Sequence, residues 1–393
     1  MSKVFLIGAG FSKSVSNTPL SRELFPLIYD KAKKEEPKRP QYKNYRDMFL
    51  KFNDKLQNSL KPLIKILKDG DTQLKTSKEY PDMFFPDIET VCTMLDLNIE
   101  KPFIPEGIGV DLKACPIQFI EGYTVDKLKS VRNFIYQKIV ELLLPSNLTA
   151  NKKLLEKTVS IIEKGDTVIT FNYDLLLEQG LLNRGLWNPK DGYCVGEVKE
   201  EELDLLENLN QSEVRVLKMH GSVCWESPSW HNSNLRILLK DPYKDLPFFD
   251  EINTMKNVVE KKYSYYQSHH VILPTFMKFY RNSWEIKLVK LAVNALSNAE
   301  EVYIVGYSLP EADAMANFLI SSIQYDTCVK IINPSAGELR KRLVHIFGLS
   351  RNNIIDENSR LEEWIKNDFK YVAYEKTIEN EEMINRMLED NRN

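Results

Sequence analysis

Residues 4–12 read VFLIGAGFS, an uninterrupted apolar run that ends at a pair of glycines. A short apolar run followed by glycine predicts a strand that is buried on both faces, as in a parallel sheet. Glycines after such a strand let the backbone approach a pyrophosphate, and the next helix directs free N–H groups toward it. Position 13 is Lys instead of the third glycine of the dinucleotide fingerprint, so a purely structural tight turn remains an alternative.

The same strand-then-turn pattern returns in the second half of the chain. Further strands are predicted at residues 166–171, 214–219, 270–273, 301–305 and 329–332. Helices are predicted between the late strands, at 283–298 and at 311–323, the second with a capping box formed by Ser308 and Glu311. Alternating strands and helices predict an α/β fold: a Rossmann-like parallel sheet with helices on both faces, whose ligands bind at the carboxyl ends of the strands.

The segment between the first strand and the second half has a different texture. Residues 31–165 are rich in lysine and in helix-like stretches and lack the strand–turn–helix pattern. We therefore expect a Rossmann-like core from residues 1–30 and 166–348, with 31–165 as an inserted, mostly helical subdomain. Residues 349–393 are charged and predict a C-terminal helical tail. A helix is predicted to start at Pro19 in the core segment, and Pro26 is expected to kink or shorten it.

Charge, cysteine content and hydropathy limit which cellular compartment and which partners are expected. The net charge is −3 over 393 residues, which gives no general attraction to nucleic acid or to anionic membranes. The five cysteines are scattered and form no C-x-x-C pair, so neither a zinc site nor a disulfide framework is expected. The opening apolar run is too short for a signal peptide or a membrane span, which favours the cytoplasm. Lys and Arg outnumber acidic residues over 31–68. This basic segment is either a solvated helical face or a contact for a polyanion or an acidic partner.

Polar residues follow several of the predicted strands. The stretch TFNYD at 170–174 begins in the last residues of the strand at 166–171 and places Asn172 and Asp174 in the turn that follows. Such residues are common in ordinary turns. A short amide beside a carboxylate also suits recognition of a cationic nicotinamide ribose: Asn172 would hold the ribose hydroxyls or a water, and Asp174 would favour positive charge nearby.

A histidine follows the strand at 214–219. His220 is next to Gly221, which leaves room for a ligand, and histidine is the natural general base near neutral pH. A hydrogen-bonded structural role is the alternative. We expect structural roles for the other histidines, which are His231, His269, His270 and His345.

Two late turns complete the set. GYSLP at 306–310 follows the strand at 301–305, and Asn333-Pro334 follows the strand at 329–332. Both can be ordinary strand-to-helix turns. Their functional interpretation is a second wall of the site, which holds the adenosine half of a dinucleotide.

Taken in order, GAGFS, TFNYD, MHG, VGYSLPEAD and INP resemble the sirtuin superfamily, most closely the bacterial sirtuin-like branch of anti-phage defence systems. The motifs span residues 4–334, and the sequence between them shows no resemblance. The resemblance implies NAD as substrate and makes His220 the catalytic histidine, with Asn172 and Asp174 beside the nicotinamide ribose. The scattered cysteines predict that no metal is bound. The residues it assigns to NAD binding are Gly8, Ala9, Gly10, Phe11, Ser12, Thr170, Asn172, Asp174, Gly306, Ser308 and Asn333.

Two departures from the protein-deacylating sirtuins narrow the activity. The chain lacks their four zinc-binding cysteines, and residues 13–20 read KSVSNTPL where those enzymes carry a Gly-Ile-Pro-Asp-Phe-Arg-like loop. Both differences favour simple NAD hydrolysis to nicotinamide and ADP-ribose, for NAD depletion. Deacylation, ADP-ribosylation and a non-catalytic module that binds NAD or ADP-ribose remain alternatives. The branch also implies a homo-oligomer and a regulatory partner such as a HerA-like ATPase.

Overall fold

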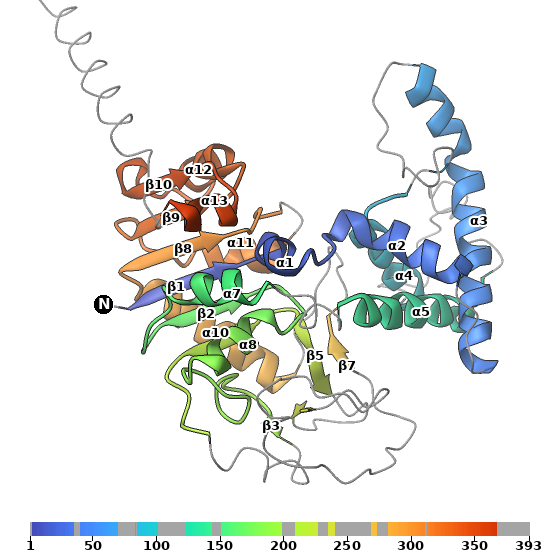
Figure 1. Ribbon diagram of the computed structural model, residues 1–393. Coiled ribbons are helices and arrows are strands. Elements are labelled where there is room, and N and C mark those ends of the chain that lie inside the picture. The colour runs from blue at the N-terminus through green and yellow to red at the C-terminus, as the bar shows by residue number, and fades with distance from the viewer. Residues whose placement is uncertain are drawn as a thin grey trace, which may run out of the picture. The chain divides into compact units, whose positions relative to one another are not determined.

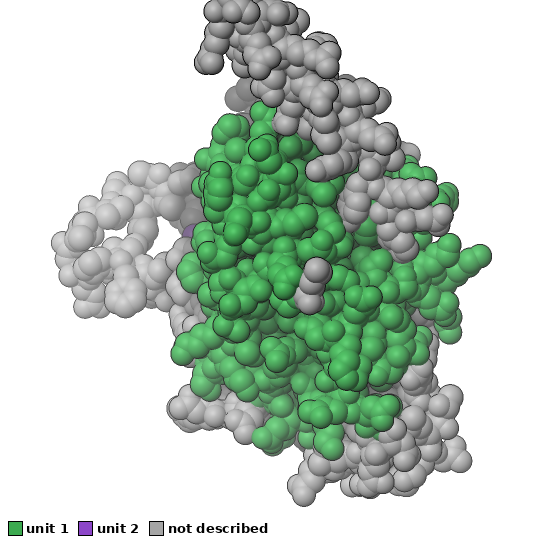
Figure 2. All heavy atoms as spheres, turned by 90° about the vertical axis from the view of Figure 1, so that its left-hand side faces the viewer, with its two compact units in different colours: residues 1–18, 144–271, 279–393 green, residues 19–143, 272–278 purple. Residues whose placement is uncertain are grey.

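A computed structural model describes most of the chain. The described residues are 2–34, 40–69, 83, 85–100, 123–143, 151–198, 209–226, 235–239, 269–272, 282–310 and 313–367. They divide into two compact units. Residues 1–18, 144–271 and 279–393 form unit 1, which is green in Figure 2, and residues 19–143 with 272–278 form unit 2. Among the described residues, no helix is both long and apolar enough to cross a membrane.

Unit 1 is organised around a six-stranded sheet in which every strand pair is parallel. Its strands, in spatial order, are β10 (Ile354–Glu357), β9 (Cys328–Ile332), β8 (Glu301–Val305), β1 (Lys3–Ile7), β2 (Thr167–Thr170) and β4 (Arg215–Lys218). Neighbouring strands that are distant in the sequence indicate crossover connections, as in the doubly wound dinucleotide-binding fold. The α/β, Rossmann-like fold predicted from the sequence is confirmed (Figure 1).

The central position of β1 follows from its composition. Val4 to Ile7 are at most 3% exposed, because β1 pairs with β2 on one side and β8 on the other. The register places Phe5 opposite Tyr303, and their rings stack at 4.8 Å. A run of apolar residues without alternation is what a strand covered on both faces requires.

The helices of unit 1 fall into two contacting groups, one with α1, α7, α8 and α13 and the other with α10 and α11, while α12 lies against β9 and β10. Their bounds are α1 (Ala9–Ser16), α7 (Lys152–Val159), α8 (Leu176–Asn183), α10 (Ser283–Ser297), α11 (Ala314–Ile320), α12 (Ala336–His345) and α13 (Leu361–Lys366). Helix α10 begins where predicted, with the Asn282 N–H donating to Glu285 Oε2 at 2.8 Å.

A second, four-stranded sheet was not expected. Its strands, in spatial order, are β3 (Glu197–Val198), β6 (Arg236–Ile237), β5 (Gly221–Glu226) and β7 (His269–Val271). The strand predicted at 270–273 is therefore not part of the parallel sheet: β7 pairs antiparallel with β5. Gly221 has φ +80°, a left-handed conformation that lets the chain leave β4 and start β5 within a few residues.

Three further expectations differ from the structure. Helix α11 begins at Ala314 instead of the predicted 311, and the Asp313 side chain caps it by accepting from Ala316 N–H at 3.2 Å. Glu311, the partner of Ser308 in the predicted capping box, lies outside the described residues. The expected helical tail from 349 contains β10, the sixth strand of the sheet. Helix α2 (Ser21–Lys34) continues through Pro26, which stands within its first two turns.

Unit 2 is helical. It contains α2 together with α3 (Pro40–Asp69), α4 (Ile88–Glu100) and α5 (Val125–Leu143). Aromatic rings build its core, with Phe49 centred 5.9 Å from Phe25 and 4.9 Å from Phe134. Its boundaries differ from the expected insertion 31–165, since α2 belongs to unit 2 while α7 belongs to unit 1.

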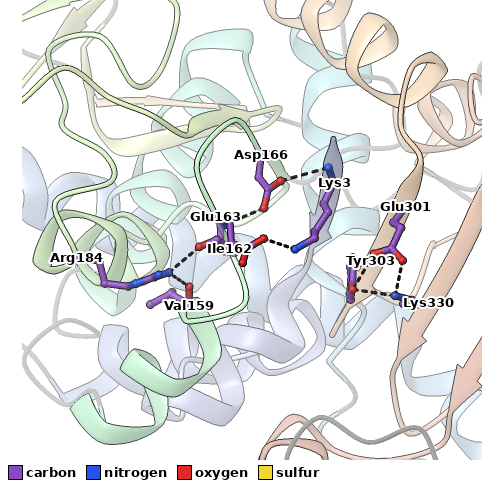
Figure 3. Close-up of polar contacts among 9 residues, drawn as sticks. All are labelled: Lys3, Val159, Ile162, Glu163, Asp166, Arg184, Glu301, Tyr303 and Lys330. Carbon is purple, nitrogen blue, oxygen red and sulfur yellow. Dashed lines mark hydrogen bonds and ion pairs between the residues drawn. The ribbon is translucent and has the colours of Figure 1, made fainter. Parts of the chain in front are cut away.

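Polar contacts hold the amino-terminal edge of the large sheet (Figure 3). Asp166, just before β2, accepts from the main-chain N–H groups of Lys3 at 3.2 Å and Glu163 at 2.8 Å. Between β8 and β9, Lys330 Nζ donates to Glu301 Oε1 at 2.7 Å. Burial raises the pKa of Asp166, and the hydrogen bonds from these two N–H groups act in the opposite direction. These contacts fix strand ends opposite the edge where the predicted motifs gather.

Candidate functional site

The predicted motifs all follow strands of the parallel sheet. Because its strands are parallel, the segments after Ile7, Thr170, Lys218, Val305 and Ile332 emerge at one edge. The chain order reverses between β1 and β8, and in open α/β sheets ligands bind at such a switch point, outside the carboxyl ends of the strands.

The two glycine turns at the switch point pack against each other. Gly10 N–H donates to Gly306 O at 2.8 Å. A Cβ on Gly10 would lie 2.7 Å from that oxygen, one on Gly306 would lie 2.4 Å from the Phe11 nitrogen, and one on Gly8 would lie 2.6 Å from Tyr307 Cα. The structure thus gives these glycines a packing reason of their own: only glycine lets the turns after β1 and β8 approach this closely.

Helix α1 begins at Ala9, immediately after this turn. A helix N-terminus carries partial positive charge and main-chain N–H groups suited to a phosphate. Ala9 is exposed there, whereas Ser12 is 1% exposed and the Phe11 side chain is fully buried in the core. Phe11 therefore contributes packing, and Ala9 is the part of this loop that faces solvent.

Asn172 joins the loops after β1 and β2. Its Nδ2 donates to Gly8 O at 3.0 Å and to Ser12 Oγ at 2.9 Å. A main-chain carbonyl can only accept, so Gly8 fixes which end of the amide faces it. Thr170 Oγ1 supports the same connection by donating to Ile7 O at 3.1 Å and accepting from Asn172 N–H at 3.1 Å. Asn172 is 9% exposed, so this orientation is held inside the fold.

Asp174 closes the same loop. Its Oδ1 accepts from Leu176 N–H at 3.2 Å, a side-chain turn that starts helix α8, and the residue is 4% exposed. Its main-chain oxygen accepts from Lys218 Nζ at 2.6 Å. The structure gives Asp174 a turn-forming role, which is the alternative that the sequence left open.

His220 lies in the turn between β4 and β5. Its ring packs 5.1 Å from Phe171 and 6.2 Å from Tyr173, which are the neighbours of Asn172 in the TFNYD loop. Its Nε2 lies 3.2 Å from Asp313 Oδ2, and the two side chains are 8% and 4% exposed. A protonated His220 would therefore form a buried ion pair with Asp313.

Asp313 is a site residue that was not predicted from the sequence. Tyr307 OH donates to its Oδ2 at 3.5 Å, and the Tyr307 ring stacks on Phe171 at 4.4 Å with 9° between the planes. Its other oxygen, Oδ1, caps α11. The signal that could have found it was an Asp in front of the Ala314–Ile320 helix, at the end of the VGYSLPEAD motif.

Asn333 and Ser308, two of the residues predicted to hold the adenosine half, differ in their contacts and exposure. Asn333 Nδ2 donates to Tyr307 O at 3.2 Å, and its Oδ1 accepts from Ser335 N–H at 2.9 Å. Asn333 therefore holds the loop after β8 against the loop after β9. Ser308 is exposed at the surface of the same loop.

Direct contacts thus bring together most of the residues chosen from the sequence. Hydrogen bonds connect Gly8, Ser12, Thr170 and Asn172, and the stacked rings of Phe171 and Tyr307 link them to the β8 loop, with His220 packed against Phe171. Ala9 and Ser308 lie at the surface around this cluster. Within the part of the chain that the structure describes, no group of three or more His, Cys, Asp or Glu residues could hold a metal ion.

Comparisons with known proteins give the family resemblance a second basis. No curated protein matches the chain. Among solved structures, a Sir2 enzyme from work on the mechanism and regulation of these enzymes is 15% identical, covering 54% of this chain and 70% of its own with a TM-score of 0.28. Residues 166–329 match the family model of the SIR2-like domain. The stretch that the family model matches runs from β2 into β9, so this part of the Rossmann-like sheet is similar to the SIR2-like domain.

Proposed function

We propose that this chain cleaves NAD between nicotinamide and ribose and releases nicotinamide and ADP-ribose. The observation that carries the proposal is the convergence of Asn172, His220 and the glycine turn of α1 at the switch point of the sheet. The SIR2-like domain match supports NAD as the substrate.

The bond to be broken defines what the site must supply. The bond between ribose C1′ and the nicotinamide nitrogen breaks, its electron pair leaves with nicotinamide, and water adds to C1′ with loss of a proton. Because nicotinamide in NAD is already cationic, its departure needs no acid, in contrast to ordinary glycoside hydrolysis. The protein must orient the ribose, stabilise the developing positive charge and accept one proton.

Asn172 and His220 suit two of these tasks. The Asn172 amide nitrogen is directed to Gly8 and Ser12, so its Oδ1 is the end that would accept from a ribose hydroxyl or a water. His220 would accept the proton from the attacking water or from a ribose hydroxyl. Asp174 would supply negative charge beside the ribose, in addition to its turn-forming contact with Leu176.

Asp313 would stabilise the proton once His220 holds it. Its carboxylate is 3.2 Å from Nε2 and is shielded from water, where such a contact is stronger than at a surface. Asp313→Asn should lower kcat by about tenfold or more, within the range of general-base effects. Asn is an equally good helix cap, so α11 should persist.

The measurement is steady-state NAD turnover beside a thermal melt. Tyr307→Phe is the matched control, since it removes the long contact from the hydroxyl to Asp313 and keeps the stack on Phe171. A folded Asp313→Asn variant with wild-type kcat would show that Asp313 does not assist His220.

Chromatography of NAD incubated with the purified chain tests the proposed function. Nicotinamide and ADP-ribose should form in equal amounts as NAD disappears. Nicotinamide release only with an added acyl peptide or protein acceptor would instead indicate deacylation or ADP-ribosylation. Tight NAD binding by calorimetry without product, with every partner present, would indicate a binding module.

The sequence motifs that resemble the anti-phage branch also suggest a cellular role and a means of control. NAD depletion during phage infection would be the purpose of the reaction, with a homo-oligomer and a HerA-like ATPase partner as its means of control. The homo-oligomer is tested by size-exclusion chromatography with light scattering, where a multiple of 45.8 kDa is expected. A strict monomer under all conditions would remove that part.

A further inference from the structure

A buried ion pair lies beside the TFNYD loop. Lys218, the last residue of β4, and Glu178, in the first turn of α8, are 2.7 Å apart, with side chains that are 0% and 1% exposed. Removing two charges from water is costly, and apolar residues of similar volume often replace such pairs without loss of stability. Stability alone therefore does not explain why the chain places these charges here.

Lys218 has a second acceptor that an apolar residue could not serve. Its Nζ donates to the main-chain oxygen of Asp174 at 2.6 Å. The same ammonium thus connects the end of the TFNYD loop to the strand that leads, two residues later, to His220. Val223 N–H adds a parallel link from β5 by donating to Tyr173 O at 3.0 Å.

Glu178 is itself held on its far side. Tyr193 OH donates to Glu178 Oε1 at 3.1 Å and lies 3.4 Å from Cys224 Sγ. Burial raises the pKa of Glu178, while the neighbouring Lys218 charge acts in the opposite direction. The charged form of Glu178 is therefore stabilised by Lys218. Because Tyr193 also holds the Glu178 carboxylate, the Lys218 ammonium stays beside Glu178 and within reach of Asp174 O.

We propose that the Glu178–Lys218 pair positions the TFNYD loop against the β4–β5 turn, so that Asn172 and His220 act on the same ribose. The inference rests on the proposed NAD cleavage and assigns Lys218 as a positioning residue, which need not touch the substrate. The hydrogen bond from Lys218 Nζ to Asp174 O gives Lys218 this role, because the ion pair with Glu178 could by itself be replaced by two neutral residues.

The experiment compares wild type with the double variant Glu178→Gln, Lys218→Met, which leaves no unpaired buried charge. Two readouts are used: kcat and KM for NAD, and hydrogen–deuterium exchange of peptides covering residues 170–178. The matched control is Glu213→Gln, Lys164→Met, which neutralises an ion pair of 2.6 Å whose side chains are 37% and 74% exposed.

The double variant should keep its Tm within about 3 °C of wild type. Its kcat should fall about tenfold or more, the scale of a misplaced reacting group, with KM changed less than about threefold. Exchange over 170–178 should speed up about tenfold while peptides of β1 and α10 stay unchanged. The control should match wild type in every readout.

Wild-type kcat and wild-type exchange in the folded double variant would overturn the inference. If wild type itself releases no nicotinamide, the proposed function fails, whereas exchange over 170–178 still tests the positioning. If the double variant does not fold, Tyr193→Phe removes the hydroxyl contacts to Glu178 and Cys224 and leaves both buried charges in place. That variant should still speed exchange over 170–178 by about threefold, and unchanged exchange would again overturn the inference.

Discussion

Replacing His220 with alanine should reduce NAD cleavage by at least about a hundredfold, the lower range for loss of a general base. The proton from the attacking water or ribose hydroxyl would then have no acceptor beside the Asn172 loop. Initial rates of nicotinamide release by purified enzyme measure the effect. Circular dichroism and a thermal melt establish that the variant is folded.

His345→Ala is the control for this prediction. His345 is the last residue of α12, which packs against β9 and β10, so its loss should leave the rate unchanged. Asn172→Ala should also abolish turnover, and it should cost about 1–3 kcal/mol of stability because the buried Gly8 oxygen loses its donor. Near-wild-type nicotinamide release by both site variants would refute the assignment of the catalytic residues.

The second large effect concerns stability. Gly306→Ala should lower the free energy of unfolding by about 1–2 kcal/mol for the left-handed backbone at φ +58°. The new methyl group would also overlap the Phe11 nitrogen at 2.4 Å, which adds about 1–3 kcal/mol of overpacking. Urea unfolding of the variant measures the sum, and NAD binding should weaken with it.

Gly165→Ala separates the cost of the left-handed backbone from the cost of the steric overlap. Gly165 has φ +89°, and a Cβ added to it would meet no atom within 4 Å, so its substitution carries the backbone cost without the overlap. Equal losses for the two variants would show that the turns after β1 and β8 can move apart, and that their close packing does not require glycine.

How far the sequence predicts this fold depends on the length and burial of each segment. Strands β1, β8 and β9 were predicted within one residue, because each is a five-residue run in a sheet paired on both sides. β3 and β6 contain two residues each and carry no periodicity to detect. β10 reads Ile-Ile-Asp-Glu within a charged stretch, and only pairing with β9 makes it a strand.

The site was less predictable than the sheet. Loops after parallel strands must share an edge, which is why Asn172 and the glycine turn of α1 could be grouped from sequence alone. An Asp in front of a helix indicates a cap at Asp313, and Lys218 ends a strand, but neither position predicts a contact with the site, since a charged side chain there is normally solvated. Their contacts with His220 and Asp174 depend on tertiary packing between segments far apart in the chain.

A crystal structure of the His220→Ala variant with NAD bound tests most directly whether the carboxyl edge of the sheet is the NAD site. We expect the pyrophosphate at the start of α1 and the nicotinamide ribose within hydrogen-bonding distance of Asn172. NAD bound elsewhere on the chain, or bound here with its nicotinamide ribose turned away from Asn172 and residue 220, would contradict the proposed function.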